Sequence, residues 1–424
     1  MNMSRHIVSL IIIAFFLGFQ GPELALAGEF EDYFSAGLNA EDAGNYDAAV
    51  EHFSRALKLE PRSATTWAKR GEVYLRKGKP SQAIPDLLQA VKLDPAHAAA
   101  FSRLGFAYNA LNEYEKAIPA LDKAIKLDPT MAQAFNTRGF AFNGRGDYKR
   151  AIADFDKAIR IDSTDPRFFN NRGFAYNGLG DYERAIADFD RAAKLNPKDP
   201  MIYNNRGVAY LRQHAYKKAI ADFNRAIKLN SSFWSAYHNR GQAYSGLGED
   251  EKAIEEFSKV IEANPNRAAI YKDRGIAYRK LGDYDLAVKD FEKAMELDKK
   301  LFAARAALGL LYATAKDPRY RKPKKALTLS RKAVRISGGR NPDMLRNLAE
   351  VQMALSERRQ AVRNLEKAIS LAPDNEEYRT LLKKWGGEAA PGERVRARRR
   401  EEPAESAPAR RPTRAQGRKG STLW

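Results

Sequence analysis

Aromatic residues and glycines recur in a fixed order along most of this chain. An aromatic residue stands four residues before a glycine and another stands three residues after it, as at Phe169, Gly173 and Tyr176. Positions i, i+4 and i+7 lie on one face of an α-helix. The pattern therefore predicts a series of amphipathic helices. Each carries a glycine in its buried stripe, where a second helix can approach closely.

The glycines in this pattern are spaced 34 residues apart. They are Gly37, Gly71, Gly105, Gly139, Gly173, Gly207, Gly241, Gly275 and Gly309. A second pattern follows each of the first, with small residues on either side of a bulky one, as at Ala151, Phe155 and Ala158. Gly-Asp-Tyr triplets such as 146–148 separate the two patterns; glycine can end one helix and aspartate can cap the next. The sequence predicts ten helix–turn–helix repeats between Phe30 and Asn375.

These residues resemble the tetratricopeptide repeat (TPR) family, whose pattern is W-x2-L-G-x2-Y, then A-x3-F, then P. Trp67, Gly71, Tyr74, Ala83 and Pro95 follow it. Six repeats have arginine where the family has leucine before the glycine, namely at Arg70, Arg138, Arg172, Arg206, Arg240 and Arg274. The resemblance implies an all-α fold, a right-handed superhelical solenoid of about ten TPR helix-turn-helix units. Pro85 and Pro119 fall inside predicted second helices, where proline weakens a turn.

Four segments are expected along the chain. They are a signal peptide at 1–27, the TPR array at 28–375 with insertions in 313–340, a capping helix at 376–385, and a disordered basic tail at 386–424. The tail is rich in Arg, Pro, Ala, Glu and Gly, a composition that buries too little apolar surface to fold.

The expected signal peptide has a basic start at Arg5 and His6, an apolar run at 7–19 and a small-x-small site at Ala25-Leu26-Ala27. The apolar run is shorter than the roughly 20 residues that span a bilayer. An uncleaved anchor is the alternative. The segment predicts an exported chain, periplasmic or secreted after cleavage near Ala27.

Asparagines and phenylalanines recur every 34 residues on the face of the first helices that the core does not use. The resemblance implies that this face lines a concave groove, which in TPR proteins commonly holds peptides. The asparagines are Asn109, Asn136, Asn143, Asn170, Asn171, Asn177, Asn204, Asn205 and Asn239, and the phenylalanines are Phe106, Phe140 and Phe174. Because an asparagine amide both donates and accepts hydrogen bonds, such rows fit the backbone of an extended polypeptide. Asn171, Asn205 and Asn239 are similar to the asparagine ladder of O-linked GlcNAc transferase. The alternative is that the asparagines cap neighbouring repeats and the phenylalanines form inter-repeat core.

Positive charge is concentrated near the end of the array. The whole chain has a formal net charge of +20, and residues 316–340 combine ten Lys or Arg with one acid, Asp317. We expect a polyanion-binding surface at Arg319, Arg321, Lys322, Lys324, Lys325, Arg331, Lys332 and Arg335. A solvated, solubility-giving end is the alternative.

The sequence shows no catalytic residue set, no cofactor motif and no metal-ligand set. Cysteine is absent, the five histidines have no partner at helical metal-ligand spacing, and Asp154, Asp188 and Asp222 repeat in second helices as structural or solvated positions would. We therefore predict a non-enzymatic scaffold or adaptor of the cell envelope that binds a protein or peptide. An anionic envelope polymer or lipid is a further expected partner, and nucleic acid is not expected. The alternatives are a polyanion- or membrane-surface-binding envelope protein that acts through its basic end, and an accessory subunit of an envelope enzyme complex.

Overall fold

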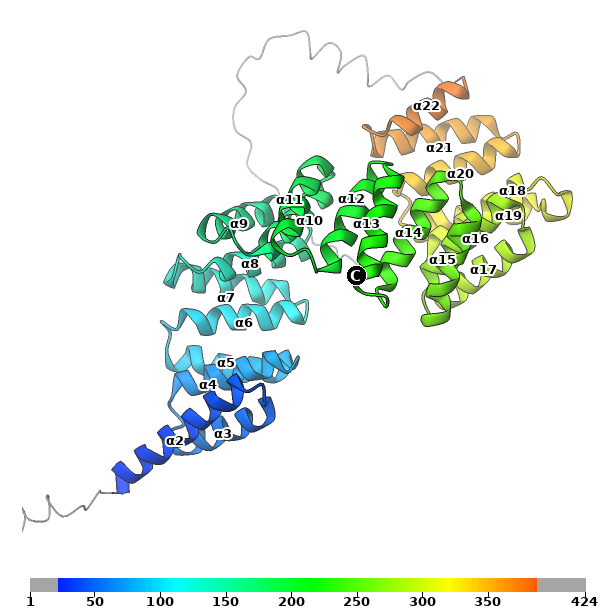
Figure 1. Cartoon of the computed structure of the whole chain (residues 1–424). Helices are drawn as coiled ribbons and strands as arrows, with labels where there is room; N and C mark the ends of the chain where they lie inside the picture. The colour runs from blue at the N-terminus through cyan, green and yellow to red at the C-terminus, as the bar shows by residue number, and fades with distance from the viewer. Residues whose placement is uncertain (1–21, 387–424) are drawn as a thin grey trace, which may run out of the picture. The chain divides into compact units, whose positions relative to one another are not determined.

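A computed structural model describes residues 22–386 of the 424-residue chain (Figure 1). Within that range the regular structure consists of twenty-one α-helices and one short 3-10 helix, without strands. The described residues divide into two compact units, 22–197 and 198–386. The predicted all-α class is confirmed.

The first unit contains five helical hairpins. They pair α2 (Pro22–Asp42) with α3 (Tyr46–Leu59), α4 (Ala64–Arg76) with α5 (Pro80–Leu93), α6 (Ala98–Ala110) with α7 (Tyr114–Leu127), α8 (Ala132–Gly144) with α9 (Tyr148–Ile161), and α10 (Pro166–Leu179) with α11 (Tyr182–Leu195). Each second helix also packs on the first helix of the next hairpin, so the hairpins form a continuous stack within the unit.

The second unit contains five more hairpins and a closing helix. They pair α12 (Pro200–Arg212) with α13 (Tyr216–Leu229), α14 (Trp234–Leu247) with α15 (Asp250–Ala263), α16 (Ala268–Leu281) with α17 (Tyr284–Leu297), α18 (Phe302–Thr314) with α19 (Pro323–Ile336), and α20 (Pro342–Ala354) with α21 (Arg358–Leu371), before α22 (Glu376–Lys384). The extra residues of the ninth repeat lie between α18 and α19 and include the 3-10 helix η1 (Pro318–Tyr320).

The repeated glycine makes room for the bulky residue of the second helix. A Cβ atom placed on Gly173 in α10 would lie 2.8 Å from Cε1 of Phe189 in α11, and the carbonyl oxygen of Ala185 is 3.1 Å away. Phe189 is fully buried. Because the two helices cannot approach this closely over a side chain, glycine is used despite its low helix propensity.

The repeated arginine forms a buried ion pair that spans three helices. The Arg172 guanidinium in α10 donates to both carboxylate oxygens of Asp188 in α11, at 2.8 and 2.6 Å, and to Asp156 in α9, at 2.7 Å. The Asp188 carboxylate raises the pKa of Arg172 above its usual value. The same pair recurs sixteen residues apart as Arg70–Asp86, Arg138–Asp154, Arg206–Asp222, Arg240–Glu256 and Arg274–Asp290. Arginine therefore replaces the family leucine together with a matching acid, and Asp154, Asp188 and Asp222 have a structural role.

Glycine and aspartate end and begin the helices as their chemistry predicts. Gly180 and Gly282 adopt positive φ after α10 and α16, and the Asp181 side chain accepts a hydrogen bond from the Arg184 amide at the start of α11. Helices α5 and α7 continue through Pro85 and Pro119, both of which are exposed.

Two expected segments lie mainly outside the described residues. The signal peptide at 1–27 overlaps them only at 22–27, which belong to α2, and the tail at 386–424 overlaps them only at Gly386. In residues 22–386 no helix combines the length and apolarity needed to cross a bilayer.

Candidate functional site

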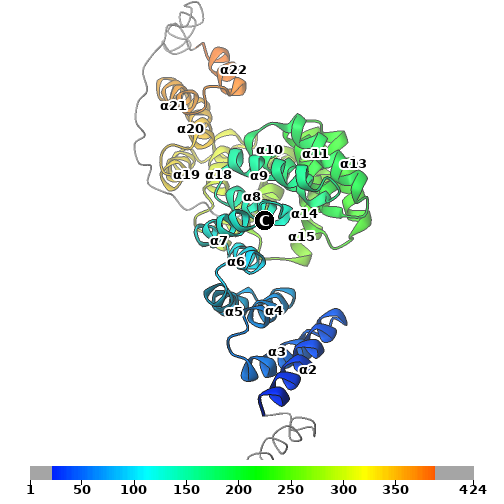
Figure 2. The same ribbon diagram turned by 90° about the vertical axis from the view of Figure 1, so that its left-hand side faces the viewer.

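Asparagines two and three residues before the repeated glycine pair with each other between neighbouring first helices. Asn171 in α10 donates through Nδ2 to Oδ1 of Asn136 in α8 at 2.9 Å, and Asn239 in α14 donates to Asn204 in α12 at 2.9 Å. Figure 2 shows the first helices α6, α8 and α10 following one another in the first unit. Asn136 and Asn204 are buried, so these pairs connect adjacent repeats. Part of the predicted asparagine set is therefore hydrogen-bonded between repeats.

Asparagines four residues after the glycine connect repeats in a different way. Asn109 in α6 donates to the Thr137 carbonyl at 2.7 Å, and Asn143 in α8 donates to the Asn171 carbonyl at 3.4 Å. The side-chain oxygens of Asn109, Asn143 and the equivalent Asn177 in α10 are buried and accept no hydrogen bond from the described residues. An acceptor left in this state destabilises a protein by about 1–3 kcal/mol. Three consecutive first helices thus each hold one unsatisfied acceptor at the same position.

Phenylalanines lie beside these acceptors. The residue one after the glycine and the residue four after it are about 60° apart on a helix, and so share a face. Phe106 and Phe174 are each 49% exposed, whereas Phe140 is half-buried. The Phe106 and Phe174 rings therefore present apolar surface to solvent beside the acceptors. Asn170 and Asn205, also in the predicted set, are partly buried.

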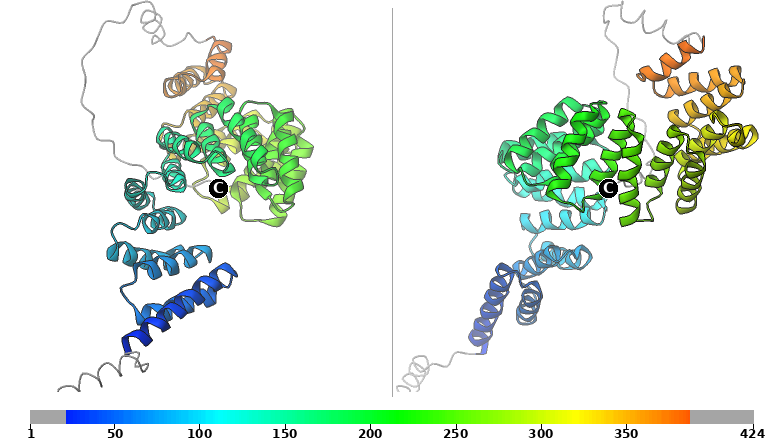
Figure 3. Two further views of the ribbon diagram at one scale, coloured as in Figure 1. Left: turned by 60° about the vertical axis from the view of Figure 1, so that its left-hand side comes forward. Right: turned by 45° about the vertical axis from the view of Figure 1, so that its right-hand side comes forward.

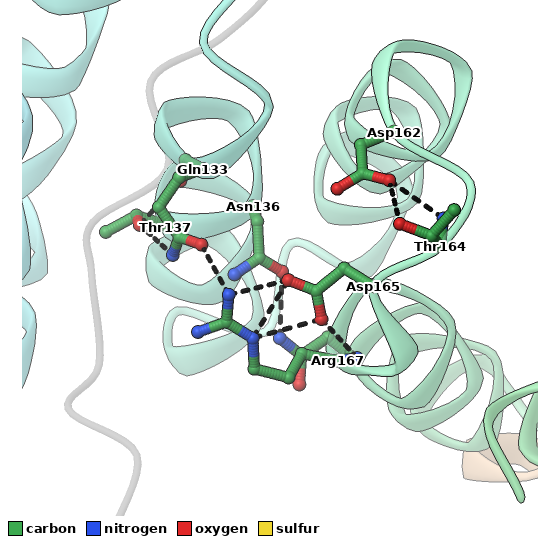
Figure 4. Close-up of polar contacts among 8 residues, drawn as sticks. Gln133, Asn136, Thr137, Asp162, Thr164, Asp165 and Arg167 are labelled. Atoms are coloured by element: carbon green, nitrogen blue, oxygen red, sulfur yellow. Dashed lines mark hydrogen bonds and ion pairs between the residues drawn. The ribbon is translucent and has the colours of Figure 1, made fainter. Parts of the chain in front are cut away.

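A polar cluster joins the N-terminal ends of α8 and α10 (Figure 4). Arg167 in α10 forms an ion pair with Asp165 at 2.6 Å and donates to the Gln133 side chain in α8 at 3.1 Å. Gln133 in turn donates to the Thr137 hydroxyl at 3.2 Å. The cluster lies on the same helices as the Asn136–Asn171 pair, and its Arg167–Gln133 hydrogen bond is an additional, exposed contact between them.

The second unit has a charged version of the asparagine pair that the sequence analysis did not identify. His238 occupies the position of Asn136 and Asn204, and its Nε2 lies 2.7 Å from Oδ2 of Asp273 in the next first helix. Gln242 donates to the same oxygen at 3.1 Å, and Lys272 contacts Oδ1 at 2.5 Å. Although burial favours the neutral acid, the hydrogen bond to His238 and the charge of Lys272 lower the pKa of Asp273 to about 2. The separation of 35 residues, which the asparagine pairs share, is the signal that could have revealed it.

The expected polyanion-binding residues lie on and just before α19, and all eight are exposed. Arg319 forms an ion pair with Asp317 at 2.7 Å, and Arg321 donates to the Ala315 carbonyl at 2.9 Å. The Lys322 ammonium lies 4.9 Å from the Tyr312 ring centre. The remaining five form no ion pair with any described residue, and α19 contains no acid; they are Lys324, Lys325, Arg331, Lys332 and Arg335.

Residues 22–386 contain no group of three or more His, Asp or Glu side chains that could hold a metal ion. The surfaces of the described residues present hydrogen-bonding amides, exposed aromatic rings and charged side chains.

The stacked hairpins and their 34-residue period define a helical-repeat protein. Tetratricopeptide repeat sequence models match residues 34–98, 68–132, 172–232, 235–267 and 268–301, and a TPR repeat model matches 141–180. Together the matches cover more than half of the chain. The chain belongs to the tetratricopeptide repeat family.

Two curated relatives match short segments of the chain. A FAM10 family protein of Arabidopsis thaliana is 43% identical over 49 residues, which are 12% of this chain and 11% of the relative. A TPR repeat-containing thioredoxin of the same plant is 40% identical over 52 residues, which are 12% of this chain and 14% of the relative. The chain thus spans only a small part of the length of these relatives. Among solved structures, a tetratricopeptide repeat protein from Parabacteroides merdae is 20% identical, with a TM-score of 0.49, over 62% of this chain and 99% of that one.

Proposed function

We propose that this chain is a non-enzymatic scaffold that binds an extended polypeptide along the first helices of its repeats. The observation that carries the proposal is the row of unsatisfied acceptors at Asn109, Asn143 and Asn177, with exposed Phe106 and Phe174 beside it. Backbone N–H groups of a ligand would satisfy such acceptors without selecting a sequence. The phenylalanine rings would supply apolar contacts for ligand side chains.

The proposed mechanism is passive. The asparagine pairs and the Arg–Asp pairs hold the first helices in place before a ligand arrives, so the scaffold loses little conformational entropy on binding. Asn143 and Asn177 are partly exposed residues, and the proposal requires their buried amide oxygens to turn outward when a ligand binds.

The test uses a dodecamer peptide selected from a random phage-displayed library on the purified chain, with its Kd measured by calorimetry. Phe106→Ala combined with Phe174→Ala should weaken binding about tenfold or more, because the peptide loses its contacts with two aromatic rings that it would cover. The matched control is Leu88→Ala with Ile161→Ala, which removes two side chains of 45% and 43% exposure from second helices. Equal effects of the two double variants, or failure to select any peptide, would contradict the proposal.

We also propose that α19 binds polyanions, as a second function of the chain. The supporting observation is that five exposed cations on this helix have no acidic partner among the described residues. The expected ligands are an anionic envelope polymer or lipid surface. Replacing Lys324, Lys325, Arg331 and Lys332 by glutamine should weaken retention of the chain on heparin and on vesicles rich in anionic lipid at low salt. If this variant were retained on heparin and on the vesicles as strongly as the natural chain, the proposal that α19 binds polyanions would be wrong.

We also propose that the chain is exported, which would bring it to the cell envelope. This proposal rests on the residue pattern at 1–27. Amino-terminal sequencing of the protein from its native cells should begin at Gly28; a sequence beginning at Met1 in the cytosolic fraction would refute it.

A further inference from the structure

The last four second helices of the array change the sign of their charge along the chain. Helix α15 has five acids and two lysines, and α17 has four acids and two lysines. Helix α19 has five cations and no acid, and α21 has four cations and one acid. Figure 3 shows these hairpins in succession toward the end of the second unit (green to orange). The last two hairpins are therefore basic in their second helices, whereas the two before them are acidic.

Helix α19 lacks acids because its neighbours lack the repeated arginine. In α9, Asp156 accepts a hydrogen bond from Arg172 of the next first helix at 2.7 Å. Arg331 holds the place of Asp156 in α19, five residues after the repeated alanine, and Leu348 holds the place of Arg172 in α20. With no arginine to pair, this position of α19 does not need an acid. The cation there is exposed instead.

Three cations on α21 extend the basic surface of α19. Arg359, Arg363 and Lys367 are exposed and form no ion pair with any described residue. They are spaced four residues apart and so lie along one side of the helix. Helix α20 packs against both α19 and α21, which places the two second helices beside the same first helix. The five unpaired cations of α19 and these three residues together form what we call the basic face.

The cations of the basic face are spread over a surface rather than along a line. On α19, Lys324, Arg331 and Arg335 share one side of the helix, and Lys325 and Lys332 share the adjacent side. The three cations of α21 form a further row. A single polymer strand follows one row at a time, whereas the head groups of a membrane contact all of the rows together. The arrangement therefore favours a planar array of anions.

The basic face offers little apolar surface for insertion into a bilayer. Among the described residues, α19 has no exposed large apolar side chain, and in α21 only Leu371, its last residue, is exposed. Leu327 and Leu329 of α19 pack against the core instead. Attraction to a membrane must therefore come from charge. Each Lys or Arg close to an anionic membrane strengthens binding about fivefold.

We propose that the basic face docks on a membrane surface rich in anionic phospholipid, with its cations next to the head-group phosphates and no side chain inserted into the bilayer. The proposal rests on the proposed binding of polyanions by α19. It adds the three cations of α21 and selects a lipid surface over a soluble polymer. Because α15 and α17 are acidic, the same surface repels them. The last two hairpins would therefore face the membrane.

The test measures cosedimentation of the full chain with vesicles of phosphatidylcholine alone and with vesicles of phosphatidylcholine and phosphatidylglycerol in equal amounts. The quantity compared is the gain in affinity that phosphatidylglycerol gives, because any contribution of the apolar segment at 7–19 is common to both compositions. Replacing Arg359, Arg363 and Lys367 by glutamine, the α21 variant, should reduce this gain about tenfold or more. Salt at about 1 M should release the chain from the anionic vesicles, as expected for contact without insertion.

A matched control removes the same charge from another second helix. Lys149, Lys157 and Arg160 of α9 are exposed and form no ion pair with any described residue. Replacing these three by glutamine should reduce the gain less than about threefold, because only the net charge changes and salt screens it. Circular dichroism should show the same helix content and Tm for both triple variants, since all six side chains are exposed.

Heparin, a soluble linear polyanion, distinguishes a polymer from a lipid surface. The α21 variant should keep its affinity for heparin within about threefold, because the rows of α19 remain available to the strand. Equal affinities of the α21 variant and the α9 control for anionic vesicles would overturn the proposal. So would an equal loss of affinity for heparin and for vesicles in the α21 variant, or retention on the anionic vesicles at high salt. None of these results touches polyanion binding by α19, which fails only if the glutamine variant of α19 is retained as strongly as the natural chain.

Discussion

At the scale of single residues, the Arg–Asp pairs show how a charged residue replaces an apolar one inside a repeat. The third repeat has Leu104 where six other repeats have arginine, and Ala120 sixteen residues later where those six have an acid; both are buried. The same pair of positions is thus filled by an ion pair in some repeats and by an apolar pair in the third repeat. Burying an ion pair often gives no more stability than a well-packed apolar pair, but losing one partner leaves a charge without compensation.

Asp188→Asn should therefore destabilise the first unit by about 1.5–3 kcal/mol, because it removes the charge of one partner of Arg172 and leaves Asp156 as its remaining acid. The double variant Arg172→Leu, Asp188→Ala has the same residues at these two positions as the third repeat. It should recover most of the lost unfolding free energy. Urea denaturation followed by circular dichroism measures both. Lys252→Gln, which removes an exposed pair with Glu249, is the control and should change stability by less than about 1 kcal/mol. A loss of the same size in the control and in Asp188→Asn would refute the interpretation.

The His238–Asp273 pair predicts a stability change at acidic pH. The folded pKa of Asp273, about 2, lies below the usual 3.8, so the carboxylate stabilises the folded state above pH 4 and this contribution disappears as the pH falls toward 2. Its size is about 2 kcal/mol. The difference in unfolding free energy between the natural chain and Asp273→Asn should be largest near pH 7 and shrink between about pH 4 and pH 2. The same comparison for Glu255→Gln, an exposed acid, should show no such trend.

At the scale of helices, the two prolines inside α5 and α7 are the clearest local conflict between sequence and structure. Later repeats have alanine at the equivalent place, at Ala153, Ala187 and Ala221. Proline removes one helical hydrogen bond and strains the preceding turn.

Pro85→Ala combined with Pro119→Ala should therefore stabilise the first unit by about 1–2 kcal/mol, after allowance for the greater freedom of the unfolded chain. A rise in Tm measured by circular dichroism checks this. Pro80→Ala serves as the control, because Pro80 is the first residue of α5, where proline is favoured. If Pro80→Ala raised Tm as much as the double variant, the position of the prolines inside a helix would not be the cause of the stabilisation.

Helix order and ends could be predicted from sequence because they depend on local chemistry. Gly180 and Asp181 mark a turn by their backbone preferences alone, and the phase of Gly173 and Phe189 fixes which faces meet. The partners of the asparagines could not be predicted. Whether Asn171 bonds Asn136 or a ligand depends on how far one first helix is rotated against the next, and the 34-residue period does not specify this.

At the scale of the whole molecule, each hairpin contacts mainly its neighbours, and this predicts how damage spreads. Phe155 in α9 is fully buried among residues of α8, α9 and α10, and Phe291 in α17 holds the equivalent place among residues of α17 and α18. Truncation of either ring to alanine should destabilise its surroundings by about 3–5 kcal/mol. In a repeat array the loss passes from one interface to the next and weakens with each.

Hydrogen exchange followed by mass spectrometry should therefore give two different maps. Phe155→Ala should increase exchange in α6–α11 and leave α16–α22 protected, whereas Phe291→Ala should do the reverse, so that each variant is the control for the other. The alternative is that the array unfolds as one cooperative body. In that case either variant would raise exchange everywhere by the same factor, and nearest-neighbour packing would no longer describe the stability of this chain.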